Sequence, residues 1–106
     1  MTARRVVTTR RADEDITRAL EGYLEADARD AASDLIDMLR DARDLLSTHP
    51  SIGSARHAAE TGILELRSVA LKRFPFILFS ADDADAVRIH RVLRSTRDLP
   101  AELFGD

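Results

Sequence analysis

The chain carries a row of arginines in its last third that could bind an anionic partner. Residues 67–97 contain seven basic residues against three acidic ones, whereas the whole chain of 106 residues has a formal net charge of −3. Guanidinium groups suit carboxylates and phosphates because their planar fork makes two parallel hydrogen bonds. A basic region within an acidic chain predicts an acidic partner for that region alone, so we do not expect the chain by itself to bind nucleic acid. The side chains expected to face a target are Arg67, Arg73, Arg91, Arg94 and Arg97.

The same region could cleave RNA only if it also supplied groups that take up and release protons. Phosphodiester cleavage needs a base for the 2′-hydroxyl, an acid for the leaving oxygen, and cations on the phosphate. The only tyrosine, Tyr23, lies in the first predicted helix and none follows it, so His90 is the best proton carrier in this region. A ribonuclease would therefore use His90 with Arg91, Arg67 and Arg73. Because one histidine without a placed partner is a poor acid–base set, the sequence favours binding over catalysis.

Other site types are not indicated. Cysteine is absent, and the three histidines are widely spaced, so we expect no disulfide, no metal site and no cofactor. No apolar run approaches the ~18 residues that cross a membrane. The N-terminus lacks the apolar core of a signal peptide. We therefore expect a single cytoplasmic domain over residues 1–106.

The elements that must position these side chains follow the order β-αα-βββ. Residues 3–9, 63–68, 73–80 and 86–94 have strand patterns, and residues 10–26 and about 28–48 carry apolar residues at helical spacing. Short connections between the last three strands predict an antiparallel meander. The helices form a hairpin on one face of the sheet. The expected fold is thus α+β, with a small antiparallel sheet, an N-terminal helical hairpin and a short C-terminal helical turn.

Two of the predicted strands allow more detailed predictions about which side chains are buried and which share a face. Residues 73–80 are almost continuously apolar, which is typical of a central strand covered on both faces. Alternation in the last strand places Val87, Ile89, Arg91 and Leu93 on one face.

Several motifs resemble the ParE branch of the RelE/ParE toxin superfamily, the toxins of bacterial type II toxin–antitoxin pairs. They are the element order, Pro50-x-x-Gly53, the Leu66-Arg67 pair, F-P-F-I-L-F at residues 74–79 and R-V-L-x-x-x-R-D-L-P at residues 91–100. The resemblance covers nearly the whole chain. It implies a ParD-like antitoxin that wraps the toxin in a hetero-oligomer and holds it inactive. It also implies DNA gyrase as the target of the free toxin, with a role in plasmid stabilisation and growth arrest.

The same superfamily leaves two alternatives open. RelE-like relatives cut mRNA on the ribosome, so a ribosome-dependent endoribonuclease is the main alternative. Where relatives with R-V-L-H carry a histidine, this chain has Arg94, which does not release its proton near neutral pH. The third alternative is an inactive homologue that only binds the antitoxin.

The apolar surface of the helical hairpin is wider than one buried stripe requires. We expect the excess to form a groove for an amphipathic segment of the antitoxin. The residues expected to line it are Leu20, Leu24, Ile36, Met38 and Leu39.

Overall fold

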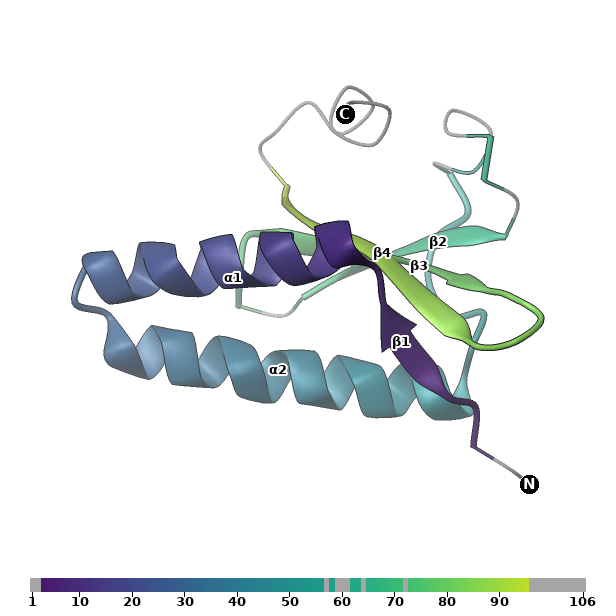
Figure 1. The fold of residues 1–106 in the computed structure, drawn as a ribbon, viewed down its shortest axis with the longest axis horizontal. Helices are drawn as coiled ribbons and strands as arrows, with labels where there is room; N and C mark the ends of the chain where they lie inside the picture. The colour runs from purple at the N-terminus through teal and green to yellow at the C-terminus, as the bar shows by residue number, and fades with distance from the viewer. Residues whose placement is uncertain (1–2, 57, 59–61, 64, 72, 96–106) are drawn as a thin grey trace.

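The computed structural model describes residues 3–56, 58, 62–63, 65–71 and 73–95 (Figure 1). Their elements are β1 (Val6–Thr8), α1 (Arg10–Glu25), α2 (Arg29–Thr48), β2 (Leu66–Ala70), β3 (Phe76–Asp82) and β4 (Val87–Arg94). This confirms the α+β class and the predicted order of elements. The predicted C-terminal helical turn lies outside the described residues.

The sheet is mixed, with the strand order β1-β4-β3-β2. β2, β3 and β4 form the predicted antiparallel meander, but β1 pairs in parallel with β4, with Val6 opposite Val87. The expectation of an antiparallel sheet therefore holds for three of these strands. Between β1 and β4 the chain passes through α1, α2, β2 and β3, which together form the long connection that parallel pairing needs. The helical hairpin is the first part of this connection. It returns the chain to the start of β1, where Ser47 at the end of α2 accepts from the Arg4 amide and donates its hydroxyl to the Arg4 carbonyl.

α1 begins at a threonine that serves two purposes. The Thr9 hydroxyl oxygen accepts a hydrogen bond from the amide of Ala12 at 3.0 Å, as an N-cap residue does. The same hydroxyl donates to the carbonyl of His90 at 2.9 Å. The cap that starts the helix therefore also holds the helix start on β4.

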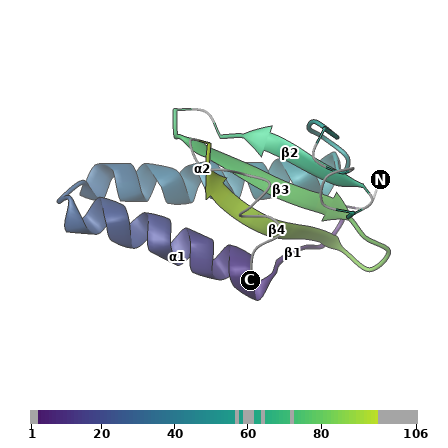
Figure 2. The ribbon, with the colours of Figure 1, turned by 90° about the horizontal axis from the view of Figure 1, so that it is seen from above.

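The hairpin turns at Asp27, which adopts a left-handed conformation with φ of 57°. The amide of Ala28 donates to the carbonyl of Tyr23, a bond pattern that commonly closes helix ends. α2 starts again at Arg29, so the two helices run antiparallel with almost no connecting chain. In both ribbon views the turn of the hairpin extends well beyond the end of the sheet (Figures 1 and 2).

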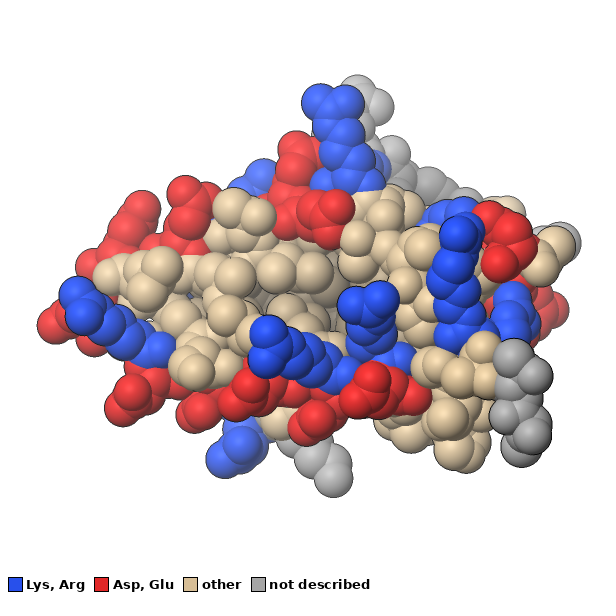
Figure 3. Space-filling model, turned by 60° about the horizontal axis from the view of Figure 1, so that its bottom comes forward, with Lys and Arg blue, Asp and Glu red and all other residues tan. Residues whose placement is uncertain are grey.

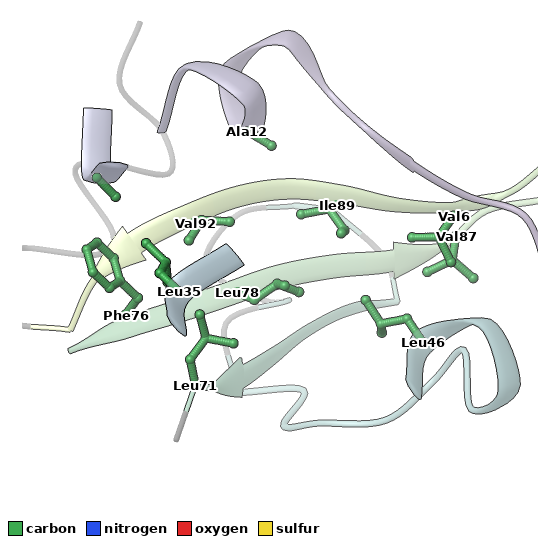
Figure 4. Close-up of a cluster of buried hydrophobic side chains, with 11 residues drawn as sticks. Val6, Ala12, Leu35, Leu46, Leu71, Phe76, Leu78, Val87, Ile89 and Val92 are labelled. Carbon is green, nitrogen blue, oxygen red and sulfur yellow. The ribbon is translucent and has the colours of Figure 1, made fainter. Parts of the chain in front are cut away.

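The main core lies between the hairpin and one face of the sheet (Figure 4). Its buried members are Val6, Ala12, Ala19, Leu35, Leu46, Leu71, Phe76, Leu78, Val87, Ile89 and Val92. A second cluster contains Leu66, Phe79 and Leu93. Because Leu78 belongs to the first cluster and Phe79 to the second, β3 buries side chains on both faces, as its apolar sequence predicts.

β4 contains one residue more than β3 opposite it. Phe79 pairs with Arg91 and Ser80 with Ile89, so His90 forms a β-bulge. The extra residue reverses the alternation of the strand. Ile89 therefore joins the helix-side core whereas Leu93 joins the other cluster, and the prediction that these two residues share one face is wrong.

A buried ion pair joins α1 to β4. Arg91 donates from Nε to Asp15 Oδ2 at 2.7 Å and from Nη2 to Asp15 Oδ1 at 2.9 Å, and the two side chains are 8% and 4% exposed. Oδ2 also accepts from the amide of Val92 at 3.0 Å. β1 covers this edge of β4 only as far as Ile89. Asp15 therefore occupies the place of a neighbouring strand and satisfies a guanidinium and an edge amide together.

We predict that Asp15→Asn lowers the free energy of unfolding by about 3–5 kcal/mol, because it removes the charge of one partner in a buried pair. The double variant Asp15→Asn/Arg91→Met should lose less than the sum of the two single variants, since both charges disappear while an acceptor for Val92 remains. Urea denaturation measures these values. Glu14→Gln, which changes an exposed carboxylate on the same helix, is the control. A loss for Asp15→Asn no larger than that of the control would contradict the assignment.

Candidate functional site

Two of the arginines predicted to face a target have partners inside the chain. Arg91 is buried against Asp15, so its guanidinium is not on the outer surface. Arg67 lies on β2 opposite Ser80, and its side chain is 24% exposed. Its Nη2 atom is 3.7 Å from the Glu65 carboxylate, a separation that indicates a weak surface pair.

Arg73 and Arg94 are the exposed members of the predicted set within the described chain. Arg73 lies between β2 and β3, and Arg94 ends β4 opposite Phe76, the first residue of β3. Both therefore lie at the same end of the sheet. The guanidinium carbon of Arg94 is 5.1 Å from the centroid of the Phe76 ring, within the range of a cation–π contact. Arg97 lies outside the described residues.

A groove that the sequence analysis missed lies beside Arg94. It has a volume of about 130 Å³ and runs between α1 and the edge of β4. Its lining consists of Asp15, Arg18, Ala19, Phe76, Val92, Leu93 and Arg94. Arg18 is exposed and follows Asp15 by three residues, so both side chains lie on one flank of α1. The three-residue spacing between Asp15 and Arg18 was the signal that the sequence contained. It indicates a groove only once the contact between Asp15 and β4 is known.

His90, the predicted proton carrier, is half-buried at the bulge of β4. Its Nε2 atom is buried, and no hydrogen-bond partner for it exists among the described residues. Burial lowers the pKa of His90, with Asp83 opposing and Arg88 adding to the effect. Burial therefore favours the neutral imidazole, and the nearby Asp83 carboxylate is engaged by Arg88.

Charged residues around the β3–β4 turn satisfy one another. Arg88 contacts the carboxylates of Asp83 and Asp85, and Arg4 contacts Asp82. Hydrogen bonds from Arg88 lower the pKa of the Asp85 carboxyl, and the same bonds raise the pKa of Arg88. This cluster ties the start of β1 to the turn. In the described ranges, no three His, Asp or Glu side chains are grouped so that they could hold a metal ion.

The hairpin residues predicted to bind an antitoxin divide into two groups. Leu24 and Ile36 are 54% and 38% exposed, whereas Leu20, Met38 and Leu39 pack partly against the main core. Figure 3 shows a strip of uncharged surface over the hairpin, bordered by rows of acidic and basic side chains. Leu45 is a further exposed apolar residue of α2, at 40%, that the sequence analysis did not select. Neither described helix is long and apolar enough to span a membrane.

The burial of His90 predicts a loss of stability in acid. The unfolded chain takes up a proton at His90 near pH 6.5, whereas the folded chain resists that proton because its pKa is lowered. The free energy of unfolding should therefore fall as the pH drops from 7.5 to 5.5. Thermal melts should show a smaller fall for His90→Gln and an unchanged fall for His49→Gln, which alters an exposed histidine. Equal pH dependence of the wild type and His90→Gln would contradict this account.

Comparison with known proteins gives this arrangement a family. A family model described as "ParE toxin of type II toxin-antitoxin system, parDE" matches residues 6–99. Among solved structures, the chain is similar to one described as "Chromosomal ParDE TA system from P. aeruginosa", with a TM-score of 0.69 and 17% identity, covering 87% of this chain and 96% of that chain. No curated protein matches. At 17% identity the solved structure shows a shared fold, whereas the family match extends from β1 past the end of β4. The chain belongs to the ParE toxin family of type II toxin–antitoxin systems.

Proposed function

We propose that the chain is a toxin that inhibits DNA gyrase when free and is neutralised by a cognate ParD-like antitoxin in a hetero-oligomer. The observation that carries this proposal is membership of the ParE toxin family over residues 6–99. The similar solved structure is itself described as a ParDE system, which supports an antitoxin as the partner. The toxin would act in the cytoplasm.

We infer a mechanism of binding without bond cleavage. A ribonuclease would depend on His90 and Arg91 as exposed reacting groups. His90 is half-buried with a buried Nε2 atom, and Arg91 is engaged by Asp15. These surroundings favour structural roles for both residues. Within the set predicted to face a target, contact then falls to the arginines that reach solvent, Arg73 and Arg94, with Arg67 more weakly exposed and Arg97 beyond the described chain.

The helical hairpin is the proposed docking surface for the antitoxin. Leu24 exposes a large apolar side chain next to the turn of the hairpin, and Ile36 exposes another further along α2. Leu20 and Leu39 continue this apolar surface toward the core, whereas Met38 follows Ile36 by two residues, about 200° around α2, and lies on the opposite flank of that helix. An amphipathic helix that covered this apolar surface would remove it from water, the usual driving force of helix-in-groove recognition.

The target is tested with the purified chain and DNA gyrase. Molar excess of the toxin should inhibit supercoiling, and added antitoxin should restore it. The variant Arg73→Glu/Arg94→Glu should lose most of the inhibition, whereas Arg40→Glu, a matched charge reversal on α2, should keep it. Unaffected supercoiling would exclude gyrase. Codon-linked mRNA cuts on translating ribosomes would instead support the endoribonuclease, and antitoxin binding with neither effect would support an inactive homologue.

The docking surface is tested by antitoxin affinity. Leu24→Asp and Ile36→Asp should each weaken binding by about tenfold or more, because a charge replaces an apolar contact at the centre of the interface. Leu45→Asp is the control. Leu45 has similar exposure, but it follows Ile36 by about two and a half helical turns and so lies on the opposite flank of α2. Equal weakening by all three variants would argue against a specific hairpin surface.

A further inference from the structure

The edge of β4 beyond β1 is covered by α1 and its cap as far as Val92, and its last residue, Arg94, has no neighbouring element of the described chain on that side. β1 pairs with β4 from Val87 to Ile89, but β4 continues to Arg94, and no other described strand lies on that side. Side chains of α1 and its cap partly fill the gap, because Thr9 donates to the His90 carbonyl and Asp15 accepts from the Val92 amide. Along this edge the next amide that faces away from β3 is that of Arg94, since alternate residues of a strand point their amides to the same side.

The groove at this edge presents two cations. Arg18 on α1 and Arg94 on β4 both line it, and both are exposed. Asp15 is the single acidic residue in the described lining, and both of its oxygens already accept hydrogen bonds, from Arg91 and from Val92. The groove therefore offers two guanidinium groups that Asp15 does not neutralise, above an apolar floor that includes Phe76.

We propose that this groove binds an extended segment of the antitoxin and that one carboxylate of that segment lies between Arg18 and Arg94. The proposal rests on the proposed function, since it takes the antitoxin as the partner. The amide at the end of the strand, that of Arg94, supplies a main-chain hydrogen bond to an extended peptide, and the paired guanidinium groups select an acidic side chain in it. Because Arg94 is also proposed to contact the target, the antitoxin carboxylate would neutralise the toxin by competing for the same cation.

The proposal is tested by measuring the affinity of the full-length chain for its antitoxin at low and physiological salt. Arg18→Glu and Arg94→Glu should each weaken binding by about tenfold or more, because each places a like charge beside the bound carboxylate. The double variant should weaken binding by less than the product of the two single effects, since both arginines hold one group. Arg10→Glu reverses an exposed charge on the same helix outside the groove and should bind as the wild type does. Circular dichroism checks that every variant is folded.

A charge exchange identifies the partner group. Each acidic residue of the antitoxin is replaced by lysine in turn, and one of these antitoxins should bind Arg18→Glu more tightly than the unaltered antitoxin does. Amide exchange at Arg94 should also slow in the complex, as expected for an edge amide that gains a partner.

The outcomes separate this proposal from the proposed function. If the unaltered chain failed to bind the antitoxin, both would be overturned. If it bound while Arg18→Glu and Arg94→Glu bound equally well, the groove proposal alone would be wrong. A third outcome is that removal of residues 97–106 tightens antitoxin binding, whereas Arg18→Glu and Arg94→Glu have no effect on it. This would assign the groove to the chain's own terminus and would also overturn the proposal.

Discussion

The buried pair between Asp15 and Arg91 is the constraint on which the arrangement of helix and sheet depends. The two residues are 76 positions apart, and their bidentate contact fixes α1 along a strand that the chain reaches only near its end. β1 contributes just three residues to the parallel pairing, so it cannot by itself hold α1 beside the full length of β4. The Asp15 carboxylate also accepts a hydrogen bond from the amide of Val92, a bond that a neighbouring strand would otherwise accept. A buried pair of this kind gives little net stability compared with apolar packing, but loss of either partner leaves a buried charge, so it favours one docking geometry strongly.

This constraint explains why the surfaces available for partners lie where they do. Once α1 is fixed on β4, the remainder of the hairpin must project beyond the sheet (Figure 1). Leu24, next to the turn, then has no sheet to pack against and remains exposed, whereas Ile36 follows the buried Leu35 and is exposed because it lies on another flank of α2. The same docking leaves the last residues of β4 with a helix flank instead of a strand as neighbour, which creates the groove between Arg18 and Arg94. The exposure of Leu24 and the cationic groove therefore have one structural cause.

The sequence predicts the local elements well because local physics determines them. Apolar spacing places both helices within a few residues of their observed bounds, and the apolar run of residues 73–80 correctly indicates a strand buried on both faces. The failures involve pairing over long distances. The parallel direction of β1 depends on a partner about 80 residues away. The bulge at His90 has no sequence signature such as a glycine, yet it reverses the faces of the residues that follow. The sequence therefore predicts that Arg91 is an exposed cation, whereas in the structure it binds the carboxylate of Asp15 on α1.

The buried pair also determines the electrostatics of the surface. The formal net charge of −3 would repel an acidic segment if the chain's charges acted together. Screening limits the reach of exposed charges to about 8 Å at physiological ionic strength, so an approaching carboxylate responds mainly to the nearest side chains. At the groove these are Arg18 and Arg94, together with Asp15. Because Arg91 binds Asp15 from the interior, the charge of Asp15 is compensated and the groove stays cationic. An arginine that hardly reaches solvent thus influences the charge that a partner meets, which is why its removal would alter the packing of α1 and weaken the positive potential beside it.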